Sequence, residues 1–579
     1  NIPLNQPLTE EIDNLCIDLN GVFHPCAQQI YEYGDYKPRE RLLGKSKARK
    51  KNTLKHRLRV FAKVCERIEY YRQLVQPRKR IILCIDGIAG AAKMSQQRQR
   101  RYKSAKERDF PFDPNCMTPG TLFMDHLSKY IDWYIRIAVS YNPEWENLEI
   151  IFSNEKVPGE GEHKIINYMR NYAKLGESFC IQGLDADLIM LALGTQVEQV
   201  FILRENYHKS QGFVFININL LREELVKYIK WDGKKPFRKK TAINDFIFLC
   251  FLVGNDFLPT IPTLAILEGG IDVILDVYKS IGQHLTGQKR SETITFNKAT
   301  LEKFLGTLAQ YEKGLVIEKA NKTGFFPDPI VEKHLIKVDD KYDVRYEAYK
   351  EDYYKAKFGE NYSIREICHA YLYGMQWVIT YYKKGIPDWT WQYMYNYGPF
   401  IEDLTREIKT YKFTDFELHS PVTSFEQLLA VLPPASKSLL PNPLDSIFAK
   451  KSLKKYYPKD AILAEEHSFA IKHKENSDLA RQLVEVVGES LQESVDIDII
   501  CEWIDCDSAC TNDRTWILDP IDGTKGFIRG QQYAIALALK ESDVLTLGIL
   551  ACPNIPYDQS HMGCLFVGQR GRGAKQHFL

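Results

Sequence analysis

A chain of 579 residues is too long for one compact core and predicts two or three folded units. Its hydrophobic fraction of 44% and charged fraction of 26% exclude wholesale disorder. The longest purely apolar run, residues 246–253, is far shorter than the roughly 20 residues that a membrane span needs, so we expect no membrane anchor. The 13 cysteines include no CxxC pair, which predicts buried thiols rather than disulfides or a zinc site.

The net charge of +2 conceals a strong asymmetry along the chain. Residues 37–59 contain eleven Lys or Arg and one Glu, whereas residues 461–513 contain thirteen Asp or Glu and three Lys or Arg. This reversal predicts a basic amino-terminal unit and an acidic carboxy-terminal unit. The basic run at residues 37–59 is compatible with a solvated loop or helix face, a polyanion contact or a nuclear-import signal, and the sequence leaves these alternatives open.

Several apolar stretches in the amino-terminal part are typical of buried strands, and each ends in a carboxylate. The stretch at 14–18 ends at Asp18, the one at 80–86 ends at Asp86, and the one from residue 178 runs into Asp185 and Asp187. A single Asp at a strand end is commonly a cap or turn residue. However, ligands bind outside the carboxyl ends of strands in open parallel sheets, so we expect these acids to converge on one pocket.

Three more acids extend the set. Glu160 and Glu162 follow a Pro-Gly turn that opens onto a predicted helix, and Asp256 closes an apolar segment. Clustered carboxylates raise one another's pKa unless cations neutralise them, and hard oxygen ligands suit Mg²⁺ or Mn²⁺. Two such ions about 4 Å apart would stabilise the attacking and leaving oxygens of phosphodiester cleavage. The residues alone therefore favour a two-metal nuclease.

Six segments also carry a resemblance to a known family. In chain order they read CIDLNGVFHPC, CIDGIAGAAKMSQQRQRRYKSAKE, FDPNCMTPGTLFM, PGEGEHKI, GLDADLIMLAL and FLVGNDFLPTIP. Residues 1–460 thereby resemble the Xrn family of 5′→3′ exoribonucleases. The resemblance implies an α/β fold in which a three-layer nuclease core, like that of PIN domains and flap endonucleases, spans residues 1–265. A helical extension with the RNA channel would span residues 266–460.

The resemblance also implies an activity and its residues. We expect Mg²⁺-dependent hydrolysis of single-stranded, 5′-monophosphorylated RNA to mononucleotides. The metal-binding acids would be Asp18, Asp86, Glu160, Glu162, Asp185, Asp187 and Asp256. The pocket for the 5′-phosphate would comprise Lys93, Gln97, Arg100 and Arg101, whose spacing puts them on one helix face. The first base would stack on His24 and on Trp389 or Trp391.

The carboxy-terminal part resembles a different family. The segments AILAEE, WILDPIDGTKGFIRGQQYAIALAL and LGILACPN are similar to the 3′(2′),5′-bisphosphate nucleotidase branch of the inositol monophosphatase family, over residues 461–579. The resemblance implies Mg²⁺ ligands at Glu465, Asp519, Asp522 and the carbonyl of Ile521, with Thr524 orienting the attacking water. The segment lacks the other metal-binding elements of that family. We therefore expect a partial α/β sugar-phosphatase-like fold without phosphatase activity.

Three alternative functions remain open. A structure-specific flap endonuclease would share the acid cluster, but a closed phosphate pocket between Lys93 and Arg101 would block threading past the RNA end. An inactive RNA-binding scaffold would bind without turnover, and a bisphosphate nucleotidase would act on adenosine 3′,5′-bisphosphate, which resembles a terminal RNA nucleotide. We expect a cytoplasmic location, and the Lys45 to Lys51 cluster leaves nuclear entry open.

Overall fold

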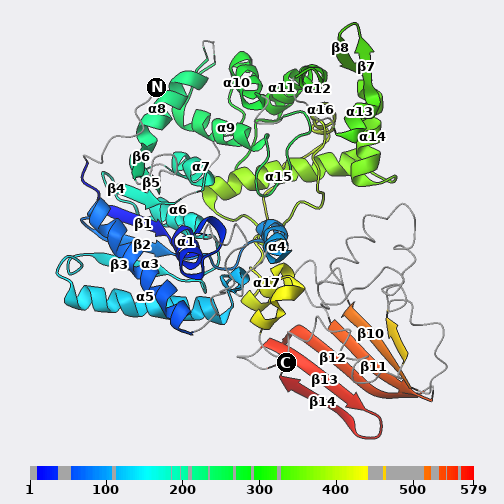
Figure 1. The fold of residues 1–579 in the computed structure, drawn as a ribbon. Coiled ribbons are helices and arrows are strands. Elements are labelled where there is room, and N and C mark those ends of the chain that lie inside the picture. The colour runs from blue at the N-terminus through cyan, green and yellow to red at the C-terminus, as the bar shows by residue number, and fades with distance from the viewer. Residues whose placement is uncertain are drawn as a thin grey trace, which may run out of the picture. The chain divides into compact units, whose positions relative to one another are not determined.

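A computed structural model gives two compact units, Asn1–Val431 and Leu432–Leu579 (Figure 1). The structure describes residues 10–36, 54–106, 112–183, 185–195, 197–205, 212–231, 235–264, 269–287, 293–322, 328–440, 461–464, 514–522, 534–542, 544–557 and 562–578. The domain boundaries expected after residues 265 and 460 both lie outside these residues, as does the basic cluster from Lys45 to Lys51, so these expectations stay predictions.

The first unit is built around a six-stranded sheet in the order β3-β2-β1-β4-β5-β6. The first five strands are parallel, and β6 runs antiparallel to β5. The strands are β1 (Asn14–Asp18), β2 (Arg80–Cys84), β3 (Glu149–Ser153), β4 (Ser178–Gln182), β5 (Gln199–Glu205) and β6 (Phe213–Asn217). Each parallel connection carries at least one helix, which the parallel arrangement requires.

Helices cover both faces of this sheet. On β1, Cys16 faces a core cluster that includes Ile165 and Met169 of α6. Its neighbours Leu15 and Ile17 point to the opposite face, where α3 packs, and are fully buried. The helices of the first unit's amino-terminal part are α1 (Asn20–Tyr31), α3 (Leu54–Val75), α4 (Ala91–Lys106), α5 (Leu122–Tyr141), α6 (Gly161–Tyr172), α7 (Asp187–Gly194) and α8 (Ile218–Ile229). This confirms the predicted three-layer α/β core.

A helical region follows the sheet in the chain and confirms the predicted extension (Figure 1). Its helices are α9 (Lys239–Phe251), α10 (Gly270–Ile281), α11 (Lys298–Ala309), α12 (Glu312–Ala320), α13 (Pro329–His334), α14 (Tyr346–Phe358), α15 (Ile364–Lys384), α16 (Ile401–Glu407) and α17 (Ser424–Val431), with a hairpin of β7 (Leu335–Val338) and β8 (Lys341–Val344). One hydrophobic cluster contains Cys16 of the sheet and Trp377 of α15. The helical region and the nuclease core therefore share a core.

The longest helix of this region, α15, has clear sequence signals at both ends. Ser363 precedes it and its hydroxyl accepts a hydrogen bond from the backbone N–H of Glu366, at 3.3 Å, which satisfies one of the free donors of the first turn. Gly385 follows the last residue at a φ of 104°, a conformation that favours glycine. Between these ends most side chains from Ile367 to Tyr382 are buried, so α15 is packed on nearly all sides.

The second unit contains a separate six-stranded sheet in the order β14-β13-β12-β11-β10-β9. Its strands are β9 (Ala461–Ala464), β10 (Arg514–Asp522), β11 (Ala534–Glu541), β12 (Val544–Pro556), β13 (Met562–Gln569) and β14 (Gly573–Phe578). The pair β9 and β10 is parallel and the remaining pairs are antiparallel. The register of β10 against β11 shifts between Asp519 and Asp522.

Two expectations from composition concern the whole chain. In the described ranges, no helix combines the length and apolar character needed to cross a bilayer. The described cysteines are free thiols, and all of them except Cys250 are buried, which confirms that expectation for this part of the chain.

Candidate active site

The strand order creates a place where a ligand can bind. From β1 the chain proceeds to β2 and β3 on one side of the sheet, and from β4 to β5 and β6 on the other, so the order reverses between β1 and β4. Ligands bind outside the carboxyl ends of the strands at such a switch point. Asp18 is the last residue of β1, Asp86 follows β2, and Asp185 and Asp187 follow β4. The structure therefore brings the predicted strand-end acids to this edge.

The amino terminus of α6 approaches two of these acids closely. The backbone N–H of Gly161 donates to Asp86 Oδ1 at 2.6 Å. A Cβ atom at position 161 would lie 2.6 Å from Asp18 Oδ1, closer than carbon and oxygen can pack. Asn20 links the same acids, because its N–H donates to Asp18 Oδ1 at 3.1 Å and its Oδ1 accepts from the N–H of Asp86 at 2.9 Å. From the sequence, Gly161 is expected only as part of the tight loop before the helix, and the role of Asn20 was missed.

The acids affect one another's protonation. Burial, followed by the negative charge of Asp86, raises the pKa of Asp18 well above its usual value. Burial and the charge of Glu160 raise the pKa of Asp86, and the same two causes raise the pKa of Glu162 well above its usual value. The upward shifts mean that burial and mutual repulsion disfavour the charged carboxylates, and a bound cation would stabilise these charged forms.

Lys93 is the cation that the structure places among these acids. Its Nζ lies 2.7 Å from Glu160 Oε2 and 2.5 Å from Asp256 Oδ2. Burial alone would raise the pKa of Glu160, but the charge of Lys93, the charge of His163 and the hydrogen bonds from Lys93 and Tyr381 together outweigh it and hold that pKa at about 2. Gln96, one turn along α4, donates from Nε2 to Asp256 Oδ1 at 2.6 Å. The helix predicted to bind the 5′-phosphate is thus joined directly to the acid cluster.

The other predicted phosphate ligands lie further along α4. Arg101 is buried, with its Nε donating to Thr118 Oγ1 at 3.0 Å and one terminal nitrogen donating to Gln97 Oε1 at 3.2 Å. Burial lowers the pKa of Arg101 to about 9, and the charge of Arg100 adds to this effect. Burial and these two arginines also lower the pKa of His24 to about 3, so His24 lies near them as a neutral ring. The structure therefore brings the predicted base-stacking histidine beside the predicted phosphate pocket.

The two candidate indoles occupy different surroundings. Trp389 is half-buried, and its carbonyl accepts a hydrogen bond at 2.9 Å from the N–H of Ala91, the first residue of α4. Trp391 packs on Trp377 of α15, with ring centroids 4.7 Å apart, as part of the hydrophobic core. Trp389 is thus the one attached to the helix that carries the phosphate pocket. The stacking role of both indoles stays a prediction.

Two tyrosines at the end of α15 are further residues that sequence reasoning missed. The hydroxyl of Tyr381 donates to Glu160 Oε1 at 2.8 Å, and the hydroxyl of Tyr382 interacts with Asp187 and lowers the pKa of that carboxyl. Burial, followed by the charge of Asp256, raises the pKa of Asp187. The sequence shows only a pair of aromatic residues in a buried helix, so it offers no signal that these hydroxyls contact acids.

The donor set suits a hard divalent cation. It consists of carboxylate oxygens, its acids raise one another's pKa, and two of them already hold an ammonium group at hydrogen-bond distance. Within the described ranges, however, no three His, Cys, Asp or Glu side chains are grouped as ligands of a single ion. The chemistry of the donors therefore fits Mg²⁺ or Mn²⁺, and the assignment of individual ligands stays a prediction.

The second predicted set of metal ligands is only partly described. Asp519, Ile521 and Asp522 lie on β10, where the register shifts between the two aspartates. Glu465 and Thr524 lie outside the described residues. The roles predicted for all five residues stay predictions.

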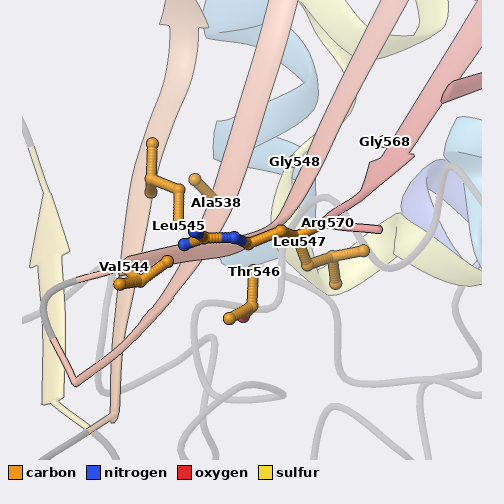
Figure 2. Close-up of a pocket in the computed structure, with 8 residues that line it drawn as sticks. All are labelled: Ala538, Val544, Leu545, Thr546, Leu547, Gly548, Gly568 and Arg570. Atoms are coloured by element: carbon orange, nitrogen blue, oxygen red, sulfur yellow. The ribbon is translucent and has the colours of Figure 1, made fainter. Parts of the chain in front are cut away.

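The second unit also has an open concavity of about 740 Å³ (Figure 2). Its lining residues are Ala538, Val544, Leu545, Thr546, Leu547, Gly548, Gly568 and Arg570. None of these eight residues is acidic or is a predicted metal ligand. The concavity is therefore not a candidate for either predicted metal site.

Three family models match successive parts of the chain. Residues 3–111 and 107–206 match the XRN 5′-3′ exonuclease N-terminus, and residues 236–326 and 332–466 match the Xrn1 helical domain. Residues 445–577 match the inositol monophosphatase family. The acids Glu160 and Asp187 thus lie in the first match, whereas Tyr381 and Tyr382 lie in the second.

Curated relatives are 5′-3′ exoribonucleases. The 5′-3′ exoribonuclease 1 of Homo sapiens is 28% identical over 545 residues, which cover 78% of this chain and 30% of the relative. That of Saccharomyces cerevisiae is 28% identical over 598 residues, covering 74% and 38%. The 5′-3′ exoribonuclease 2 of Arabidopsis thaliana is 28% identical over 634 residues, covering 78% and 59%. The chain spans less than two thirds of the length of these relatives.

Two solved structures have local similarity. A staphylococcal inositol monophosphatase-1 is 25% identical, with a TM-score of 0.13, and the match covers 22% of this chain and 32% of that one. The catalytic core of Rad2 in complex with DNA is 15% identical, with a TM-score of 0.27, and the match covers 48% and 66%. On the family matches, the chain belongs to the Xrn family of 5′-3′ exonucleases through residues 3–466, and its residues 445–577 match the inositol monophosphatase family.

Proposed function

We propose that the first unit is a divalent-metal-dependent 5′→3′ exoribonuclease that degrades single-stranded, 5′-monophosphorylated RNA to mononucleotides. The observation that carries this proposal is the convergence of strand-end acids with helix α4 at the switch point of the sheet. Lys93 of α4 contacts two of the acids directly, at 2.7 and 2.5 Å. The activity named for the curated relatives supports the same reading.

The acids would hold two Mg²⁺ or Mn²⁺ ions. The proposed ligands are Asp18, Asp86, Glu160, Glu162, Asp185, Asp187 and Asp256. When bound, such ions activate water and stabilise the oxygen that leaves the phosphorus. The protein's own groups keep the carboxylates in place, since the Gly161 N–H donates to the carboxylate of Asp86 and the Asn20 N–H donates to that of Asp18.

The 5′-phosphate would bind along α4, to Lys93, Gln97, Arg100 and Arg101. From Lys93 to Arg101 a helix rises by about 12 Å, so the end of the RNA would be held at a fixed distance from the acids. This distance would set the cleavage position after the first nucleotide. His24 lies near Arg100 and Arg101 as a neutral ring, which leaves it free to stack on the first base without regard to sequence.

A degradation assay tests the proposal. We would incubate the full chain and Mg²⁺ with 3′-labelled single-stranded RNAs that carry either a 5′-monophosphate or a 5′-hydroxyl group. Asp185→Ala is the test variant. Asp132→Ala is the matched control, because Asp132 lies on the surface of α5 and pairs only with Arg136 among the contacts that the structure gives it. We expect loss of full-length RNA only with the monophosphate, and only when Asp185 is intact.

Other results would favour the alternatives. Internal cuts that ignore the 5′ end would indicate a flap-type endonuclease. Binding of RNA without cleavage, in either Mg²⁺ or Mn²⁺, would indicate an RNA-binding scaffold. Equal loss of activity in both aspartate variants would mean that the acid at the switch point has no special role.

A further inference from the structure

The last turn of α15 is bonded to both ends of α6. At the start of α6, the hydroxyl of Tyr381 donates to Glu160 Oε1 at 2.8 Å. In the last turn of α6, the guanidinium of Arg170 donates to the carbonyl oxygen of Tyr382. The helix that carries Glu160 is therefore fixed at two points, about 15 Å apart along its axis, by adjacent residues of α15.

The same turn contacts both ends of α7. Asp187 is the first residue of α7, and the hydroxyl of Tyr382 interacts with its carboxylate and lowers its pKa. Gly194 is the last residue, and its carbonyl accepts a hydrogen bond from Lys383 Nζ. Three consecutive residues of α15 thus fix both helices that carry acids after β3 and β4.

Packing leaves the Tyr381 hydroxyl little freedom to point elsewhere. Its ring is 5% exposed and stacks on His163, with centroids 3.9 Å apart and planes at 6°. On other sides it meets Phe257 at 5.5 Å and Trp377 at 5.1 Å. The ring is held by three aromatic neighbours, so the hydroxyl is directed at Glu160 before any ligand arrives.

The hydrogen bond also distinguishes the two oxygens of Glu160. Oε1 accepts from Tyr381, and Oε2 lies 2.7 Å from the ammonium group of Lys93. A carboxylate held through one oxygen cannot rotate freely, so the other oxygen keeps facing the side where the cation lies. This is the arrangement that a hydrogen-bonded partner imposes on a metal-ligating carboxylate.

We propose that Tyr381 and Tyr382 are positioning residues, which orient the Glu160 and Asp187 carboxylates toward the metal ions. The inference rests on the proposed exonuclease function. It means that the helical region, which supplies α15, completes a site in which most of the acids come from the amino-terminal region. Neither hydroxyl needs to contact RNA or the reacting phosphate for this role.

The test uses the full chain with Tyr381→Phe and Tyr382→Phe, each of which keeps the ring and removes only the hydroxyl. Tyr354→Phe is the matched control: its ring is 1% exposed, and its hydroxyl donates at 2.8 Å to Asp403, which is not among the predicted metal ligands. For each variant we would measure Mn²⁺ affinity by electron paramagnetic resonance, kcat and KM on monophosphorylated RNA, and the melting temperature.

We expect Mn²⁺ affinity and kcat to fall by about ten- to a hundredfold in both test variants, the usual effect of removing such a partner. KM for RNA should stay within about twofold, because no contact to RNA is lost. Tyr354→Phe should lower the melting temperature by a similar amount but leave Mn²⁺ affinity and kcat unchanged. That contrast separates positioning from a general loss of stability.

Two outcomes would overturn the inference. One is that Tyr381→Phe and Tyr382→Phe lower the melting temperature and nothing else, and the other is that the control weakens Mn²⁺ binding equally. A wild-type chain that binds Mn²⁺ but does not degrade RNA would remove the proposed function. The Mn²⁺ affinities of the variants would still decide whether the tyrosines position the acids.

Discussion

Gly161→Ala tests whether the backbone of α6 must approach the acids as closely as the structure has it. Alanine in the first turn of a helix normally stabilises it by about 0.5–1 kcal/mol relative to glycine. Here the new methyl carbon would lie 2.6 Å from Asp18 Oδ1 and 3.3 Å from both Asp86 Oδ1 and the carbonyl oxygen of Cys84. Carbon and oxygen pack at about 3.3 Å, so α6 or Asp18 must retreat by about 0.7 Å.

This displacement sets the expected size of the effects on stability and on the rate of RNA degradation. Overpacking of a tight site costs about 1–3 kcal/mol, which outweighs the gain in helix propensity. A shift of about 1 Å among catalytic groups can reduce the rate about a hundredfold. The bond from the Gly161 N–H to Asp86, 2.6 Å long, would also lengthen if the helix moved. We therefore expect Gly161→Ala to lose about 1–2 kcal/mol of unfolding free energy and to degrade RNA about 10–100-fold more slowly.

Urea unfolding and the degradation rate of monophosphorylated RNA are the measurements. Gly314→Ala is the control, because this exposed glycine lies within α12 and a Cβ atom there would meet nothing within 4 Å. The control should gain about 0.5–1 kcal/mol and keep its rate. A Gly161→Ala variant that matched the control in both stability and rate would refute the argument that the close approach is required.

Three further predictions concern charge and metal. Lys93→Met removes the cation between Glu160 and Asp256. The variant should lose about 3–5 kcal/mol of unfolding free energy and also the preference for RNA with a 5′-monophosphate. A variant that unfolds at the same urea concentration as the wild type would contradict this prediction. Burial raises the pKa of Glu312 to about 7, so the folded state binds this proton more tightly than the unfolded state does. The unfolding free energy of the wild type should therefore fall by about 3 kcal/mol as the pH rises from about 4.5 to about 7. In urea unfolding, Glu312→Gln should lack this pH dependence of the unfolding free energy. Parallel plots of unfolding free energy against pH for the wild type and the variant would contradict the prediction. Chelation by EDTA should abolish RNA degradation and Mg²⁺ should restore it, whereas Asp519→Ala in the second unit should leave the rate within about twofold. We also expect the wild-type chain to release no phosphate from adenosine 3′,5′-bisphosphate. If the wild type released phosphate and Asp519→Ala abolished the release, that expectation would be wrong.

The strands that carry the acids could be predicted because their signal is local. Residues 15–17 and 81–85 are short apolar runs whose side chains are buried, and a carboxylate follows each directly. Such runs specify a parallel strand and its end without reference to the rest of the chain. The convergence of the acids then follows from the geometry of parallel sheets, which places all carboxyl ends along one edge.

The contacts that hold the acids could not be predicted in the same way. Lys93 is paired with Asp256, 163 residues away, and Tyr381 with Glu160, 221 residues away. Neither pairing has a sequence period, because each depends on how α4 and α15 pack in the folded unit. The need for glycine at 161 is likewise invisible, since only the folded position of Asp18 makes a side chain there collide.

The bond between Tyr381 and Glu160 has a consequence for the timing of synthesis. A ribosome adds about 5–20 residues per second, so the 221 residues between the partners take about 11–44 seconds to be made. Until then the nascent chain holds the acids of β1, β2 and α6 but lacks the tyrosines at the end of α15. A growing chain therefore carries an incompletely supported acid cluster throughout this interval, while it is still attached to the RNA that encodes it.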